Sequence, residues 1–88
     1  MSNEWTIRQN VLYRSFSFDD FVQAFSFMQL VATEAENLNH HPDWRNCYNI
    51  VEFYLSTHDA GNTVTEKDHA LAAAIEEIFE RIHSTINV

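Results

Sequence analysis

The sequence has very little glycine, proline and cysteine: its 88 residues include one of each. A single glycine excludes a phosphate-binding loop of the glycine-rich kind. A single cysteine cannot form an internal disulfide, which fits a reducing compartment. We predict that this residue, Cys47, is a small buried hydrophobic side chain.

Basic residues are also scarce, with five Lys and Arg against 13 Asp and Glu and a formal net charge of −8. No Lys or Arg cluster is present that could neutralise phosphates, so direct nucleic-acid binding is not expected. The first ten residues lack the apolar run of a signal peptide, and no segment is long enough to cross a bilayer. We therefore expect a cytoplasmic protein that makes no membrane contact.

Hydrophobic and aromatic residues, in contrast, are plentiful, at 45% and 14% of the chain. This composition is typical of a folded globule. The length predicts a single domain over residues 1–88 whose core is small. Assembly into a homodimer or homotetramer would stabilise such a domain.

The pattern predicts strands in two places. Residues 5–16 are rich in β-branched and aromatic types, and the polar pair at 9–10 predicts a hairpin turn between two short strands. Residues 50–58 alternate, as in a strand with one buried face. The segment 44–49 before it is either the end of a loop or an earlier part of the same ribbon. The predicted buried positions of the alternating strand are Val51, Phe53, Leu55 and Thr57.

A first helix is predicted between these strands. Ser17 and Asp20 resemble a capping box, so the helix should begin near Phe18. Pro42 disfavours helical geometry before it, so the helix should end near residue 39 or 40. Phe27, Leu30 and Val31 extend the apolar surface sideways, which either a subunit interface or a broad core-facing helix would explain. The predicted buried stripe is Phe21, Phe25, Met28, Ala32, Ala35 and Leu38.

A second helix follows a loop that begins at residue 59 and ends at Thr65. Thr65 and Asp68 form another capping-box pattern at its start. The order of elements favours an α+β fold, an antiparallel sheet with both helices on one face. The apolar positions of the second helix are Leu71, Ile75, Ile78 and Ile82.

Five histidines are many for a chain of this length, and three of them fall at the ends of predicted elements. His40 and His41 follow the first helix, and His58 ends the long strand. Imidazole changes charge near neutral pH, so such rings suit general acid and base catalysis. His69 and His83 lie on the second helix and are predicted to be solvated surface.

Carboxylates occur near these histidines. Glu36 is four residues before His40, so the two would lie on the same face of the helix. The Glu36 carboxylate would then orient the His40 ring. Asp59 and Asp68 would add negative charge. Each feature has a simpler explanation, because a histidine near a helix end can cap carbonyls, and Asp68 is better explained as a helix cap than as a catalytic group.

Other kinds of site are disfavoured. Zinc ligation lacks a cysteine pair or an HExxH motif, and neighbouring rings such as His40 and His41 do not readily face one ion. Cys47 and Ser56 are not set in a nucleophile elbow. Trp44 would either wall a pocket for a flat ligand or belong to the core.

Three segments together carry a family resemblance: AENLNHHPDW, YNIVEFYLSTHDAGN and VTEKDHALAAAIEEI. They resemble pterin-4a-carbinolamine dehydratases, over roughly residues 11–82. The resemblance implies a two-layer fold with a four-stranded antiparallel sheet in the order β-β-α-β-β-α. It also implies dehydration of 4a-hydroxytetrahydrobiopterin to quinonoid dihydrobiopterin and water, without a metal or organic cofactor. This reaction would support tetrahydrobiopterin recycling for an aromatic amino acid hydroxylase.

The resemblance also implies roles for individual residues. His40 and His58 would be the acid and base pair, without a decision on which is which, and His41 would bind and orient the pterin while sharing in proton handling. Glu36 and Asp68 would hold the histidines by hydrogen bonds. The remaining residues expected to wall or support the pocket are Pro42, Trp44, Ser56, Thr57 and Asp59.

The sequence departs from the family in the loop at 59–68, which is one residue longer than the usual form. Its tip, Asn62 and Thr63, would shift the rim of the pocket. The alternative function is a non-catalytic dimerisation or coactivator-type binding module on the same fold.

Overall fold

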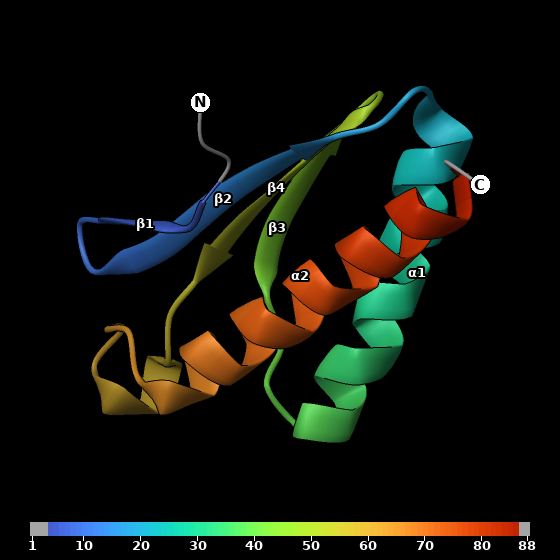
Figure 1. Cartoon of the computed structure of the whole chain (residues 1–88). Helices are drawn as coiled ribbons and strands as arrows, with labels where there is room; N and C mark the ends of the chain where they lie inside the picture. The colour runs from blue at the N-terminus through green and yellow to red at the C-terminus, as the bar shows by residue number, and fades with distance from the viewer. Residues whose placement is uncertain (1–3, 87–88) are drawn as a thin grey trace.

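The chain folds into an antiparallel sheet with two helices on one face (Figure 1). The computed structural model describes residues 4–86, with side chains described as far as Ile82. This confirms the α+β class and the order β-β-α-β-β-α. The elements are β1 (Thr6–Arg8), β2 (Val11–Ser17), α1 (Phe21–Leu38), β3 (Asp43–Cys47), β4 (Ile50–Leu55), the 3-10 turn η1 (His58–Ala60) and α2 (Glu66–Ile86).

The strand order in the sheet is β1-β2-β4-β3, and every pairing is antiparallel. The predicted turn between β1 and β2 is present, with φ of 51° at Gln9 and 67° at Asn10. Asp43 pairs with Tyr54, so the start of β3 lies beside the end of β4. The segment before β4 is therefore a strand of its own.

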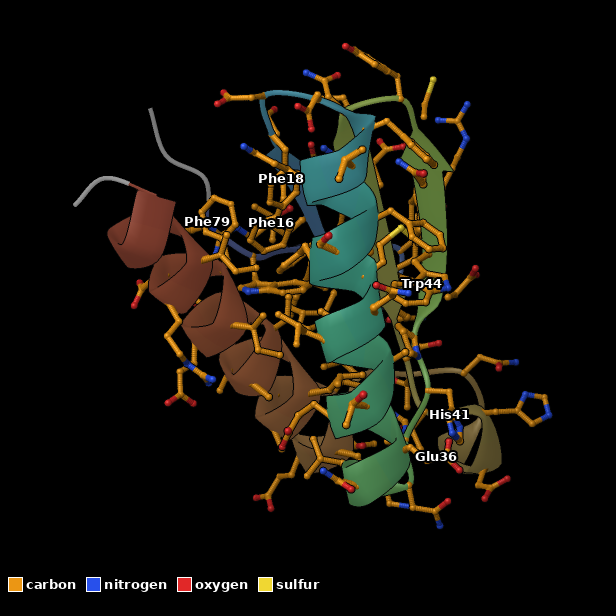
Figure 2. The ribbon with its side chains drawn as sticks, turned by 90° about the vertical axis from the view of Figure 1, so that its right-hand side faces the viewer. Phe16, Phe18, Glu36, His41, Trp44 and Phe79 are labelled. Atoms are coloured by element: carbon orange, nitrogen blue, oxygen red, sulfur yellow. The ribbon has the colours of Figure 1, made fainter. Side chains whose placement is uncertain are left out.

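The core lies between the sheet and the helices. The predicted alternation is confirmed, since the four expected side chains are buried. The predicted end of the strand is wrong, because β4 ends at Leu55 and His58 begins η1. Aromatic rings fill the end near the start of α1, where Phe16 lies 4.7 Å from Phe79 and Phe18 lies 5.6 Å from Phe79 between ring centroids (Figure 2). The buried apolar residues of α2 are Leu71, Ala72, Ile75 and Ile78, with Ile82 partly buried.

The predicted start of α1 is wrong by three residues. Ser17 still pairs with Ile50 in the sheet, and the amide of buried Phe18 donates to the Asn49 carbonyl. The chain is therefore still extended there. Asp20 is the N-cap, and its Oδ1 accepts a hydrogen bond of 2.9 Å from the amide of Gln23.

The predicted buried stripe of α1 is also wrong for most of its members. Phe21 and Phe25 are each 46% exposed, and Leu38 and Ala32 are exposed as well. The helix turns a neighbouring face to the core. On this face the ring of Phe27 packs against Phe16 and Phe53 of the sheet, with centroids 5.2 Å and 6.0 Å apart. The residues that α1 buries are Ala24, Phe27, Val31 and Ala35.

Cys47 is exposed, so the prediction of a buried thiol is wrong. It is the last residue of β3, the strand at one edge of the sheet. Along β3 the side chains alternate, and Trp44 and Asn46 are the partly buried ones. Cys47 therefore falls on the outward face.

On α2, the solvent-exposed position predicted for His69 is confirmed. The prediction for the side chain of His83 lies outside the described side chains. No helix in the described part of the chain has the length and apolar content needed to span a membrane.

Candidate active site

The predicted site residues gather at the end of the molecule where α1 ends, β3 begins, β4 ends and α2 begins (Figure 1). A cavity of 290 Å³ lies there, close to the lower limit of roughly 300 Å³ for small-ligand pockets. Segments distant in sequence form its wall. The lining residues are Asn39, His40, His41, Ser56, Thr57, His58, Asp59 and Lys67.

The end of α1 sets the direction of His40. Asn39 adopts the left-handed conformation, with φ of 55°, and its amide donates to the Glu36 carbonyl. The His40 amide donates to the Ala35 carbonyl. These two bonds form a Schellman motif, which ends the helix and turns the chain sharply. The helix therefore ends close to the predicted position, and His40 lies beyond it and does not share a helical face with Glu36.

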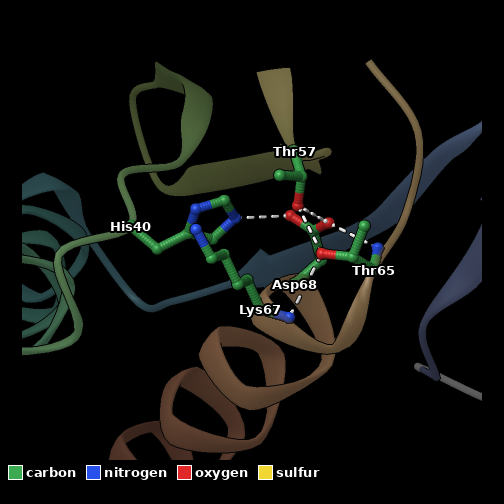
Figure 3. A network of polar contacts seen from close by, with 5 residues as sticks. All are labelled: His40, Thr57, Thr65, Lys67 and Asp68. Atoms are coloured by element: carbon green, nitrogen blue, oxygen red, sulfur yellow. Dashed lines mark hydrogen bonds and ion pairs between the residues drawn. The ribbon is translucent and has the colours of Figure 1, made fainter. Parts of the chain in front are cut away.

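His40 is held from behind by a buried carboxylate (Figure 3). Its Nε2 lies 2.7 Å from Oδ1 of Asp68, a side chain that is fully buried. Oδ2 of Asp68 accepts hydrogen bonds from the Thr57 hydroxyl at 2.7 Å and from the Thr65 amide at 2.9 Å. Because the Thr57 hydroxyl donates to Asp68, it accepts from the Thr65 hydroxyl at 2.6 Å.

The same contacts keep Asp68 ionised. Burial alone would raise its pKa, but the hydrogen bonds from His40, Thr65 and Thr57 more than offset that effect, so the pKa is lowered. An ionised carboxylate only accepts hydrogen bonds, so Nε2 of His40 carries the proton that Asp68 accepts. Nδ1 of His40 remains for exchange with a molecule in the cavity, and the side chain is 12% exposed.

Glu36 contacts His41, not the His40 ring that helical spacing predicted. Oε1 of Glu36 lies 2.9 Å from Nε2 of His41, and both side chains are exposed (Figure 2). The prediction assumed that the helix continues through residue 40. The helix instead ends at Leu38, and the left-handed turn at Asn39 brings the next histidine, His41, to Glu36.

His58 is the first residue of η1 and is exposed. Its Nδ1 lies 3.0 Å from Oδ1 of Asn62, four residues later. The cavity thus collects three imidazoles, each with one ring nitrogen hydrogen-bonded and the other available. This arrangement suits proton transfer to and from a bound molecule.

The other predicted residues divide into two groups. Ser56, Thr57 and Asp59 line the cavity, whereas Pro42 and Trp44 do not. Trp44 (Figure 2) is partly buried. Its ring packs against that of Phe53, with centroids 5.7 Å apart.

Sequence reasoning missed two residues that bond to the site. Thr65 was predicted only as a helix cap, yet its amide and hydroxyl also belong to the network around Asp68. Asn62 was noted only as part of a longer loop. For Thr65 the capping-box pattern was a usable signal. In that motif the side chain three residues after the N-cap, here Asp68, bonds back to the backbone amide of the N-cap residue, here Thr65.

Among the residues that the structure describes, no group of three or more His, Cys, Asp and Glu side chains could hold a metal ion.

Comparisons with known proteins agree on one family. The model of a family described as "Pterin 4 alpha carbinolamine dehydratase" matches residues 1–78. A protein of Rhodospirillum rubrum named "Putative pterin-4-alpha-carbinolamine dehydratase" is 53% identical over 77 residues, which cover 85% of this chain and 79% of the relative. A protein of Prochlorococcus marinus strain MIT 9515 with the same name is 49% identical over 77 residues, covering 88% of this chain and 79% of the relative.

Two solved structures share the fold. One is described as a "transcriptional coactivator/pterin dehydratase" from Brucella melitensis, with a TM-score of 0.81 and 42% identity over 86% of this chain and 82% of that chain. The other is a "pterin dehydratase-like protein" described as a RuBisCO assembly factor in the alpha-carboxysome. Its TM-score is 0.69 with 22% identity, covering 89% of each chain, and its likeness concerns the fold alone.

Proposed function

Because the chain belongs to the pterin 4 alpha carbinolamine dehydratase family, we propose that it dehydrates 4a-hydroxytetrahydrobiopterin to quinonoid dihydrobiopterin and water. One observation carries the proposal: His40, His41 and His58 line a single cavity, each with one ring nitrogen held by a neighbour. In this role the protein is a hydro-lyase that serves tetrahydrobiopterin recycling beside an aromatic amino acid hydroxylase.

The reaction needs two proton transfers and no electron transfer to an outside acceptor. A base removes the proton from N5 of the pterin, and the N5 electron pair forms the C4a=N5 double bond. The C4a–O bond breaks, and an acid gives its proton to the departing hydroxyl, which leaves as water. The acid and base then exchange their protons with solvent, so the protein is restored.

His40 is suited to be the acid. The ionised carboxylate of Asp68, 2.7 Å from Nε2, accepts the proton on that nitrogen and holds the ring in one orientation, which leaves Nδ1 for the substrate. The proton on Nδ1 is then the one available to the leaving hydroxyl. Asp68 cannot swing away, because Thr57 and Thr65 hold its other oxygen.

The other residues bind and orient. His41, backed by Glu36, would donate to the pterin and share in proton handling, and Ser56 and Asp59 would line the ring edge. The backbone groups of Thr57 are already used within its own loop, since its amide donates to Thr63 and its carbonyl accepts from Ala60 and Asn62. We therefore assign Thr57 the support of Asp68 through its hydroxyl.

The competing function is a binding module that uses this fold without catalysis. The cited Brucella melitensis structure carries both descriptions, coactivator and dehydratase. The test is the dehydration rate of freshly generated 4a-hydroxytetrahydropterin, followed by absorbance between pH 6 and 9. Wild type is compared with His40→Ala and His58→Ala, and His69→Ala, at an exposed position on α2, is the matched control.

We expect wild type and His69→Ala to accelerate dehydration equally. Each cavity variant should lose about 100-fold or more of that acceleration, the usual contribution of a positioned acid or base. Circular dichroism should show all four proteins folded. No acceleration by folded wild type would overturn the proposal in favour of the binding module.

A further inference from the structure

A short, well-bonded loop places Asn62 beside His58. The amide of Thr57 donates to the Thr63 carbonyl at 2.8 Å, which closes the loop across its base. Within it, the Asn62 amide donates to the Thr57 carbonyl at 3.0 Å. Gly61 and Asn62 both have positive φ, 83° and 60°. These constraints turn the Asn62 side chain back toward His58, so that Oδ1 of Asn62 lies 3.0 Å from Nδ1 of His58.

The partner of His58 differs in kind from the partners of the other two histidines. His40 and His41 are each held by a carboxylate, Asp68 and Glu36, a group that only accepts hydrogen bonds when it is ionised. The partner of His58 is a side-chain amide with no charge. An amide oxygen accepts a hydrogen bond from a neutral ring as well as from a charged one.

We propose that Asn62 is a positioning residue that fixes neutral His58 with its proton on Nδ1, so that Nε2 accepts the proton taken from the substrate. The inference deepens the proposed dehydration and rests on it. It makes His58 the base and leaves His40 the acid. The proton moves from N5 of the substrate to Nε2, and Nδ1–H remains bonded to the Asn62 oxygen throughout.

Backbone conformation offers a competing explanation for an asparagine at this position. Asparagine adopts the left-handed region more readily than other residues with side chains. Substitution by glycine separates the two explanations, because Asn62→Gly keeps access to positive φ and removes only the amide. Asn10→Gly is the matched control, since Asn10 also has positive φ, 67°, and lies outside the cavity lining.

The direct test is the tautomer of His58, read from long-range ¹H–¹⁵N correlations of the imidazole rings in ¹⁵N-labelled protein near pH 8.5. The His58→Gln spectrum identifies the signals. We expect wild type and Asn10→Gly to show the proton of His58 on Nδ1. In Asn62→Gly the population should shift toward the Nε2–H form. A wild-type ring with its proton on Nε2 would overturn the inference.

The kinetic test uses the same variants. Asn62→Gly should lower kcat by about three- to tenfold, the worth of one ordinary hydrogen bond, with KM little changed. Asn10→Gly should leave both constants unchanged. Equal kcat for wild type and Asn62→Gly would show that the asparagine serves only the backbone.

Asn62→Asp is the conservative variant. Its carboxylate should restore the Nδ1–H tautomer while favouring the protonated ring, so the acidic limb of the kcat/KM profile should move to higher pH. The titratable groups that line the cavity with His58 are the same in every variant: His40, His41, Asp59 and Lys67. An unmoved limb would contradict the base role of His58.

The two proposals fail separately. Wild type that does not accelerate dehydration would refute the dehydratase function, while the ring spectra would still decide whether Asn62 sets the tautomer of His58. Active wild type with the wrong tautomer would refute only the role of Asn62.

Discussion

Asp68 joins the first turn of α2 to the candidate acid. One carboxylate oxygen accepts from the Thr65 amide at the helix start, and the other meets His40. The two explanations weighed for this residue, helix cap and partner of a histidine, are therefore compatible. The donors around this buried carboxylate favour its ionised form, which links the site to the acid stability of the fold.

This link predicts a specific pH dependence for Asp68→Asn. The pKa of Asp68 is lowered in the folded protein, so its ionised form adds stability above the unfolded value of about 3.9. That contribution disappears as the pH falls through the lowered folded value. Urea unfolding should therefore show wild type more stable than Asp68→Asn by roughly 1–3 kcal/mol at pH 7.

The stability difference between the two proteins should shrink as the pH falls from about 5 to 2. Other carboxylates, such as Glu52 with its own lowered pKa, are common to both proteins and cancel in the difference. A difference that stays constant over this range would contradict the ionised, hydrogen-bonded state of Asp68.

At the residue scale, sequence reasoning found the histidines but not all their partners. Glu36 was paired with His40 because the helix was assumed to include residue 40, and one left-handed residue, Asn39, changed the partner to His41. Asn62 bonds to His58 through a loop whose course depends on several long-range contacts. Spacing in sequence does not determine such contacts.

At the scale of elements, the start of α1 allows a clean stability test. Asp20→Ala removes the side-chain acceptor for the Gln23 amide and should cost about 1 kcal/mol of unfolding free energy. In a domain of this size that corresponds to a fall in Tm of about 4–8 °C. Calorimetry measures it, and dehydration activity should be unchanged because the N-cap lies at the opposite end of α1 from the cavity.

Asp19→Ala is the control for this test. It removes an equal charge one residue earlier, from a side chain that makes no capping bond to the helix. Equal losses from the two substitutions would point to charge and not to the cap.

The strands were predictable and the orientation of α1 was not, for one physical reason. In β4, Val51, Phe53 and Leu55 fall on one face and the charged Glu52 on the other, so the face to be buried is determined. In α1, two neighbouring stripes both have helical spacing, one through Phe21 and Phe25 and one through Phe27 and Val31. Packing against the sheet selects the second stripe, and periodicity alone does not distinguish them.

At the scale of the whole molecule, the unselected stripe remains on the surface. Phe21, Val22 and Phe25 are exposed on α1, and β3 is an edge strand of the sheet that the described residues form. For a domain with so small a core, both features favour self-association. We expect light scattering at tens of micromolar to give a mass at least twice the 10.3 kDa of one chain.

Phe25→Glu should lower that mass by placing a charge on the exposed stripe. Ile7→Glu, at an exposed apolar position on β1 at the far edge of the sheet, should not. Wild type that is monomeric at this concentration would contradict the expectation.

The double role of Asp68 also connects local unfolding to occupancy of the cavity. Fraying of the first turn of α2 would move Asp68 away from His40. The folded turn and the hydrogen bond between Asp68 and His40 are therefore formed or lost together. A ligand held by His40 binds only the closed form and so suppresses fraying by mass action. Amide hydrogen exchange at the start of α2 would then slow on binding.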